Sequence, residues 1–398
     1  MARKAGLWVI PVLTVVLFVC SLLIQQALQR TWSAGSISYP GYDTVKTIAL
    51  DGEGRVWVGL EGGVGVYDGQ SWTTYTPDNS GLTGNLVEAI AIDKQGRTWI
   101  VTSGTSRAGA RTHAGAVSIL DGETWIVYNK DNSGLVSNRV EALAFDQLGR
   151  AWIGTDKALQ IFDGETWDTH FPPNAEQLGY TVNSVALDSQ GRAWIGTNWP
   201  SIGVYDGGTW RVYSPRNSRL NCMYFLSIAF DPQDRAWIFG HTCSDSYMPM
   251  PGDPRSGGGV NVFDGETWTA YNKANSGLLG NEIEALAFDP QGRAWIATRK
   301  GDGVSVFDGE TWIACKKRNS SLVSNKVEAI AFDQKGQAWL ATRKEGISVL
   351  STDGALTMPV WLVVLRILFF SPLARGCLIA AGVGLWAVVF FRSRTRRI

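Results

Sequence analysis

The sequence predicts an all-β fold: a seven-bladed β-propeller that is closed by an N-terminal strand and flanked by N- and C-terminal transmembrane helices. Three observations support this prediction, namely two columns of tryptophans, short strand patterns between them, and a last repeat that lacks one strand. The chain of 398 residues repeats itself about every 42 to 58 residues, which leaves room for one large domain of seven units.

Two columns of tryptophans mark the repeats, and they hold fourteen of the eighteen tryptophans in the chain. Members of the first column stand in segments such as GRAWIGT: Trp57, Trp99, Trp152, Trp194, Trp237, Trp295 and Trp339. Members of the second column stand mostly in DGETW-like segments: Trp72, Trp125, Trp167, Trp210, Trp268, Trp312 and, before the first full repeat, Trp32. From a DGETW tryptophan to the next GRxW tryptophan the separation is always 27 residues, but within a unit it varies from 15 to 31. All the length variation therefore lies in one loop of the unit.

Each unit reads as four short strands, which we name A to D in chain order. In the sixth unit apolar residues alternate in EALAF, AWI and VSVF, and turn residues separate these segments. The C–D turn contains Asp308 and Gly309, a pair that tolerates the positive φ of a two-residue hairpin. One such sheet cannot bury both faces. Seven sheets arranged radially can, because the tryptophans fill the space between neighbours.

The seventh unit is incomplete, and the start of the chain can complete it. Strands A to C are present in VEAIAFD, AWLAT and GISVL, but Thr357 stands where the strand D tryptophan is expected. We predict that Thr31–Tyr39, which contains Trp32, supplies the missing strand, so that the propeller spans residues 31–357. A linear solenoid would instead need atypical caps at both ends.

Two long apolar runs flank the repeats, and each is long enough to cross about 30 Å of hydrocarbon. We predict transmembrane helices at 7–25 and 372–391, with a cytoplasmic tip at 1–6 and a basic cytoplasmic tail at 392–398. An uncleaved anchor is preferred to a signal peptide because no clear cleavage site follows the first run. Basic residues at both tips place both termini in the cytoplasm and the propeller outside the plasma or inner membrane.

A third apolar stretch, 358–371, is interrupted by Arg366 and bounded by prolines. A further crossing would move one terminus outside, so we interpret this stretch as a helix in the membrane interface or an extension of the second span. Both connections to the spans are short and join the rim that carries the A–B and C–D turns. The B–C and D–A loops therefore point away from the bilayer, on the distal rim. The long inserts of units two and five are B–C loops on this rim, where binding specificity usually varies.

The motifs VEAIAFDxxGRAWIGT, GVxVFDGETW and NSGLxxN resemble the two-component regulator propeller repeats, known from the extracytoplasmic sensor regions of bacterial hybrid histidine kinases. The resemblance covers about Thr31 to Leu350. It implies a seven-bladed propeller that binds an extracellular ligand, often one derived from a saccharide. Only seven residues follow the last predicted span, so no kinase, receiver or DNA-binding region is expected there. We therefore hypothesise that a separate partner protein receives the signal.

Four carboxylates are the first candidates for ligand binding. They begin strand A at equivalent positions near the distal mouth of the channel: Glu88, Glu141, Glu284 and Glu328. Around one opening they would attract a cation or bind sugar hydroxyls. The alternative is that each bonds to the backbone or an arginine of a neighbouring blade. The arginines after the A–B turns are predicted to be structural or exposed: Arg55, Arg97, Arg150, Arg192, Arg235 and Arg293.

The B–C loops supply the remaining candidates. Trp199, in unit four, belongs to neither column and offers a flat surface to a sugar or a partner side chain, unless it only closes its loop. His113, His241 and Tyr247 lie in the two inserts, where solvated loop residues are the alternative. The short loops of units six and seven add two arginines, which favour an anionic ligand if they are more than a solvated rim: Arg299 and Arg343.

The sequence holds no HExxH, CxxC pair, GxSxG or phosphate-loop spacing, so we predict no enzymatic activity, metal site or cofactor. Zero net charge argues against nucleic acid as a partner. Cys222 and Cys243 form a candidate disulfide that would hold the longest loop. The preferred function is a membrane-anchored, sensor-like recognition module for an unknown extracellular ligand or protein. The alternatives are a propeller lyase or hydrolase that depends on His113 or His241, and a structural component of a membrane assembly.

Overall fold

The computed structural model describes residues 34–37, 44–103, 115–172, 181–221, 223–242 and 258–352. All of them belong to one compact unit that ends at Thr352. This part of the chain is built of β-strands, and it holds no helix long and apolar enough to cross a membrane. The predicted spans at 7–25 and 372–391 lie outside the described residues, as do the two tips and the stretch 358–371.

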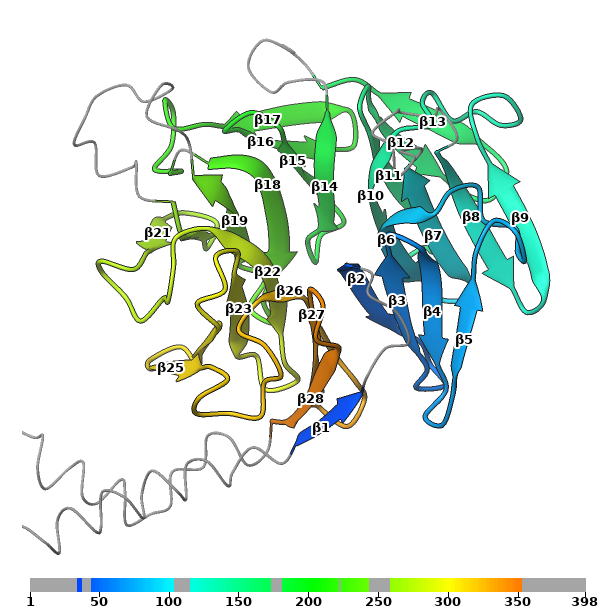
Figure 1. The fold of residues 1–398 in the computed structure, drawn as a ribbon. Helices are drawn as coiled ribbons and strands as arrows, with labels where there is room; N and C mark the ends of the chain where they lie inside the picture. The colour runs from blue at the N-terminus through cyan, green and yellow to red at the C-terminus, as the bar shows by residue number, and fades with distance from the viewer. Residues whose placement is uncertain are drawn as a thin grey trace, which may run out of the picture. The chain divides into compact units, whose positions relative to one another are not determined.

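Seven antiparallel sheets of four strands follow one another around a ring (Figure 1). Blade 1 contains β2 (Val45–Leu50), β3 (Val56–Leu60), β4 (Gly63–Tyr67) and β5 (Trp72–Tyr75), and blade 2 contains β6 (Leu86–Ile92), β7 (Thr98–Ser103), β8 (Ala116–Asp121) and β9 (Thr124–Tyr128). Blade 3 contains β10 (Val140–Phe145), β11 (Ala151–Thr155), β12 (Leu159–Phe162) and β13 (Trp167–His170), and blade 4 contains β14 (Val182–Leu187), β15 (Ala193–Thr197), β16 (Ile202–Asp206) and β17 (Thr209–Tyr213). Blade 5 contains β18 (Met223–Phe230), β19 (Ala236–Thr242), β20 (Val260–Phe263) and β21 (Trp268–Tyr271), and blade 6 contains β22 (Ile283–Phe288), β23 (Ala294–Thr298), β24 (Val304–Phe307) and β25 (Trp312–Cys315). Blade 7 contains β26 (Val327–Phe332), β27 (Gln337–Thr342), β28 (Ile347–Ser351) and β1 (Ala34–Ile37). The predicted seven-bladed propeller is confirmed.

The ring is closed by the N-terminal strand, as predicted. In Figure 1 the blue strand β1 lies beside the orange strand β28, and the two pair antiparallel from Ala34 opposite Leu350 to Ile37 opposite Ile347. In blade 6 the corresponding place opposite the end of strand C belongs to Trp312. Ala34, not Trp32, therefore stands at the tryptophan position of blade 7, and Trp32 itself lies outside the described residues. The sequence alignment missed this shift because β1 enters without the hairpin turn that fixes the register of the other D strands.

The two tryptophan columns fill the space between neighbouring blades. Trp237 of the first column is buried and meets Phe288 of the next blade edge to face, with ring centroids 5.4 Å apart. Trp312 of the second column stacks on Phe307 of its own blade at 4.5 Å and meets Tyr271 of the preceding blade at 5.6 Å. Such aromatic pairs add to the stability gained from buried area. The predicted interlocking of blades through tryptophans is confirmed.

The NSGL segments are the D–A connections, and their residues have structural roles. In the loop that follows β21, the Asn275 Oδ1 accepts a hydrogen bond from the Asn272 backbone at 2.8 Å, and its Nδ2 donates to the Ala270 carbonyl at 2.9 Å. The glycine that follows lies against the outer tryptophan of the next blade, because a Cβ at Gly277 would come within 2.2 Å of the Trp312 Cβ. This close approach explains why the segment carries glycine.

Adding one methyl group at this contact is expected to destabilise the propeller. Gly277→Ala should lower the free energy of unfolding by about 2 kcal/mol, because the new Cβ overlaps Trp312 and one of the two must move. Thermal and denaturant unfolding measure the loss. The matched control is Gly52→Ala in an A–B turn, where a Cβ would meet no atom within 4 Å, so its stability should change by less than about 0.5 kcal/mol. Equal effects of the two substitutions would contradict the packing argument.

Six of the seven A–B turns are held by a buried aspartate. In blade 6, Asp289 accepts hydrogen bonds from the backbone of Gln291 at 3.1 Å and of Arg293 at 2.9 Å, and its second oxygen accepts from the Arg293 Nε and, at 2.9 Å, from the Trp295 indole. The same arrangement recurs in blades 1 to 5 around Asp51, Asp93, Asp146, Asp188 and Asp231. The arginines after the turns therefore have the structural role predicted for them.

Two of these aspartates show how burial and hydrogen bonding compete. Burial acts to raise the pKa of Asp51 and Asp146, but the hydrogen bonds from the indole and from the following arginine outweigh it and hold both pKa values below the ordinary range. The carboxylates therefore stay ionised in the folded protein at neutral pH. The charge of both carboxylates is compensated within the turn, so the buried aspartates on this rim have a structural role.

Candidate functional site

In six of the seven blades, a β-bulge near the start of strand A leaves one extra residue in that strand. In blade 1 the register with β3 shifts between Val45 and Thr47, so Lys46 is the extra residue. The same shift leaves Glu88, Glu141, Asn183, Glu284 and Glu328 as the extra residues of their strands. Bulges commonly redirect a side chain at the rim of a sheet. All four glutamates predicted at equivalent starts of strand A are therefore bulge residues.

Four blades line one charged cavity on the rim of the B–C and D–A loops. The cavity has a volume of about 760 Å³ and is lined by Thr44, Lys46, Glu61, Glu88, Glu282, Glu284, Arg299, Lys300, Lys326, Glu328 and Arg343. Five of the ten predicted ligand-binding residues lie in it: Glu88, Glu284, Glu328, Arg299 and Arg343. The lining residues come from the starts of A strands and from B–C loops, so the two regions share one rim, as the alternation of strand direction predicts.

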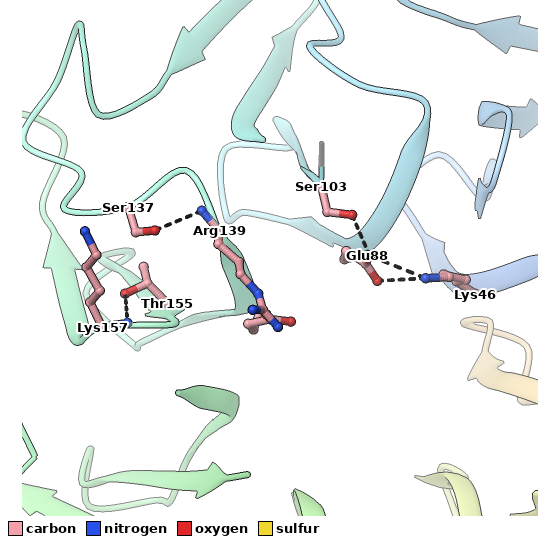
Figure 2. Close-up of polar contacts among 8 residues, drawn as sticks. Lys46, Glu88, Ser103, Ser137, Arg139, Thr155 and Lys157 are labelled. Atoms are coloured by element: carbon pink, nitrogen blue, oxygen red, sulfur yellow. Dashed lines mark hydrogen bonds and ion pairs between the residues drawn. The ribbon is translucent and has the colours of Figure 1, made fainter. Parts of the chain in front are cut away.

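The carboxylate of Glu88 is tied to the neighbouring blade. The Lys46 Nζ lies 3.1 Å from its Oε2, and the Ser103 Oγ donates to its Oε1 at 2.7 Å (Figure 2). On the other side of the cavity the Lys300 Nζ lies 3.0 Å from the Glu282 carboxylate. These pairs are partly exposed, so each contributes at most about 1 kcal/mol to stability. Glu88 therefore pairs with a lysine of the neighbouring blade, where the alternative interpretation expected an arginine or the backbone.

Two carboxylates are held more loosely. The Arg299 Nε is 3.9 Å from Glu284 and the Arg343 Nε is 3.8 Å from Glu328, distances too long for hydrogen bonds. Burial raises the pKa of Glu284, and the carboxylate of Glu328 on the adjacent blade raises it further, although Arg299 and other basic groups oppose this. Glu284 and Glu328 are therefore close enough to repel each other, and their basic partners offset this only in part.

Glu141 belongs to the same ring but does not line the cavity. Its Oε1 accepts a hydrogen bond from the Arg139 Nε at 2.6 Å, and Figure 2 shows Arg139 on the blade beside that of Glu88. Burial raises the pKa of Glu141, Arg139 opposes the shift, and the Glu88 and Asp156 carboxylates add to it. The acidic character of the ring therefore extends past the cavity into blade 3.

Among the other predicted site residues that the structure describes, Trp199 does not line the cavity. Trp199 is 40 % exposed in the B–C loop of blade 4, where its carbonyl accepts a hydrogen bond from the Ser201 backbone at 2.7 Å. His241 lies near the end of β19, and its side chain is outside the description. Four residues lie outside the described residues altogether: His113, Tyr247, Cys222 and Cys243. Their predicted roles stay predictions.

His170 lies away from the channel mouth. It ends β13 on the outer strand of blade 3, where its Nε2 is 3.0 Å from Asp168 and its ring packs on Tyr205 of the next blade with centroids 4.5 Å apart. Within the described ranges no group of three or more His, Cys, Asp or Glu side chains could hold a metal ion. The chemistry that the cavity offers is therefore charge and hydrogen bonding from Lys, Arg, Glu and Thr.

The predicted site residues leave out six of the eleven residues that line the cavity. Glu282 and Lys326 precede the bulge residues by two positions, and their carbonyls accept hydrogen bonds from the backbones of Arg299 and Arg343. Glu61 follows strand B of blade 1. The repeat alignment contained a usable signal, because the positions that flank the bulge and those that follow strand B are charged in blades 6 and 7. Which of these side chains share a cavity could be seen only once the blades were placed around the ring.

Two segments of the chain match a known family model, and the fold is similar to that of solved propellers. The family model described as two component regulator propeller matches residues 177–199 and 277–300. Among solved structures, the extracellular domain of the putative hybrid two component system BT3049 from B. thetaiotaomicron is similar over 82% of this chain, at 19% identity and a TM-score of 0.64. This chain spans 42% of the length of that protein chain. No curated protein matches the sequence.

Other propellers of different function share the architecture. Virginiamycin B lyase from Staphylococcus aureus matches 80% of this chain and 99% of its own, at 11% identity and a TM-score of 0.62. YCF48 bound to D1 peptide matches 81% of this chain and 97% of its own, at 16% identity and a TM-score of 0.57. At such identities the likeness shows the fold alone. The chain thus folds as a seven-bladed β-propeller, and two of its segments match the two component regulator propeller model.

Proposed function

We propose that the protein is a sensor-like recognition module that binds its ligand in the charged cavity at the distal mouth of the propeller. The observation that carries this proposal is the cavity itself, about 760 Å³ in volume and lined by side chains that bulges and B–C loops aim at one opening. Cavities of this size commonly hold small ligands. The repeats of the two component regulator propeller family and the likeness to an extracellular domain of a putative hybrid two component system support a sensor role.

The direction of the chain ends supports a membrane-anchored arrangement. β28 ends at Ser351 and β1 begins at Ala34, opposite Leu350, so both described chain ends lie on the rim of the A–B and C–D turns. The cavity opens on the other rim. With the apolar runs at 7–25 and 372–391 as spans, the propeller lies outside the cytoplasm with the cavity away from lipid, both termini lie inside, and a separate protein receives the signal.

No histidine is among the described residues that line the cavity, and we propose binding without catalysis. His170, the histidine whose side chain the structure describes, is on the outer strand of blade 3. An activity that depends on His113 or His241 would contradict this part of the proposal. Trp199 is proposed as an additional contact for a larger ligand or a protein partner on the same rim.

The location of the site is tested by substitution on both rims of blade 6. Saccharides, amino acids, peptides and dicarboxylates are titrated by calorimetry into the full-length protein in detergent. A ligand of the cavity is expected to bind Glu284→Gln at least about tenfold more weakly, because a contact worth about 1.4 kcal/mol is lost. The matched control, Glu310→Gln in the C–D turn of the same blade, should bind as the unmodified protein does. A ligand that is affected equally by both substitutions would place the site elsewhere.

A further inference from the structure

The charged cavity is close to electroneutral although nearly every lining residue is charged. Its lining has five acidic and five basic side chains: Glu61, Glu88, Glu282, Glu284 and Glu328 against Lys46, Arg299, Lys300, Lys326 and Arg343. Such a lining gives little net attraction to a simple anion or a simple cation, because each meets both signs of charge. Selectivity between ligands must then come from where the acidic and the basic side chains lie in the cavity.

In blades 6 and 7 the bulge carboxylates are less exposed to solvent than the guanidinium groups of the B–C loops. The side chains of Glu284 and Glu328, on the bulges of strand A, are 27 % and 14 % exposed. Those of Arg299 and Arg343, in the B–C loops, are 48 % and 47 % exposed. We name the less exposed pair, Glu284 and Glu328, the inner wall of the cavity, and the more exposed pair, Arg299 and Arg343, its outer edge.

The inner wall is receptive to positive charge. Burial raises the pKa of Glu284 and the carboxylate of Glu328 on the adjacent blade raises it further, which outweighs the opposing effect of Arg299, Lys326 and Arg343. The guanidinium groups stay 3.8 to 3.9 Å away, so these two ion pairs leave the carboxylate lone pairs open to a closer donor. An ammonium group between the two carboxylates would relieve the repulsion and supply up to three hydrogen bonds.

We propose that the cavity selects a zwitterion, with its primary ammonium beside Glu284 and Glu328 and its carboxylate or other oxyanion beside Arg299 and Arg343. This inference rests on the proposed function for the position of the site and adds the class of ligand. Guanidinium groups bind planar carboxylates through paired hydrogen bonds, so the outer edge suits the anionic end. A ligand with one charge leaves the opposite set unmatched and is rejected. The volume of the cavity accommodates a short peptide with free ends.

Four probes test the charge requirement. Tetraglycine carries both charges, N-acetyl-tetraglycine keeps only the carboxylate, and tetraglycine amide keeps only the ammonium. Titration calorimetry on the full-length protein in detergent at pH 7 is expected to show tetraglycine binding at least tenfold more tightly than either blocked peptide. Phosphoethanolamine, the fourth probe, reports the oxyanion: equal or tighter binding than tetraglycine assigns the outer edge to phosphate, and weaker binding assigns it to carboxylate.

Two substitutions assign the ends of the ligand. Glu328→Gln should weaken tetraglycine at least tenfold and leave N-acetyl-tetraglycine unchanged, because only the ammonium contact is lost. Arg343→Gln should weaken tetraglycine and leave tetraglycine amide unchanged. Glu310→Gln is the control on the other rim, and melting temperatures confirm that each variant is folded.

The outcomes separate this inference from the proposed function. Blocked peptides that bind as tightly as tetraglycine would overturn the charge requirement. The same holds if neither zwitterionic probe binds while another ligand, such as a neutral saccharide, binds and is lost in Glu284→Gln. That second result would keep the cavity as the binding site and refute the zwitterion. A ligand whose affinity is unchanged by Glu284→Gln would show that the cavity is not the binding site, and would refute the proposed function as well.

Discussion

Asp289→Ala is expected to lower the free energy of unfolding of the propeller by about 3 kcal/mol, one of the two largest effects of the changes considered. The side chain of Asp289 is fully buried, and that of Arg293 is only 12 % exposed. Removing the carboxylate leaves the Arg293 guanidinium and the Trp295 indole without their shared acceptor. Arg293 also donates to the Thr352 carbonyl at the end of blade 7, so the loss reaches across a blade boundary. Denaturant unfolding measures the effect.

Blade 7 provides the matched control for this substitution. Asp333 accepts from the backbones of Lys335 and Gln337 and from the Trp339 indole at 3.1 Å, but Gln337 stands where the other blades have arginine. Asp333→Ala therefore removes a similar set of hydrogen bonds without leaving an arginine behind. We expect a loss of about 1 to 2 kcal/mol. Equal losses at the two positions would show that the buried ion pair adds nothing to the turn.

Disrupting the closing strand is expected to have the second large effect. Replacement of Ala34–Ile37 by Gly-Pro-Gly-Pro should lower the free energy of unfolding by about 2 to 4 kcal/mol, because proline cannot donate to the ladder and β28 becomes an unpaired edge. The outer strand of blade 7 is the place where the two ends of the propeller meet, so its loss also allows the ring to open. Melting temperature and protease resistance of the full-length protein report the change.

The control for the closing strand keeps its geometry. Ser36→Thr retains every backbone donor and introduces a residue that strands favour, so stability should stay within about 0.5 kcal/mol of the unmodified protein. An unchanged melting temperature after the Gly-Pro-Gly-Pro replacement would mean that β1 does not hold the ring together. Aggregation of the replaced protein is a further expected result, because exposed edge strands pair with other chains.

Repeated local patterns carried most of the fold. The constant 27-residue spacing between tryptophans, the Asp308-Gly309 turn and the missing D strand of the seventh unit were enough to predict seven closed blades. These features are local, because each depends on alternation along one strand or on the chemistry of one turn. The register of β1, by contrast, does not follow from the local sequence. Without a hairpin to fix it, the pairing opposite Leu350 depends on contacts between the two ends of the propeller, and Ala34 took the place expected for Trp32.

The candidate site divides in the same way. Repeats alone placed Glu88, Glu284 and Glu328 at equivalent starts of strand A, since equivalent positions in a closed ring face one channel. Only the tertiary structure decided that they are bulge residues, that Arg299 and Arg343 meet them in one cavity, and that Glu141 and Trp199 do not line it. The physical reason is range: strand pattern and turn type follow from neighbours in the chain, whereas a shared cavity depends on how far each blade rotates toward the axis and on the side chains that the adjacent blade presents.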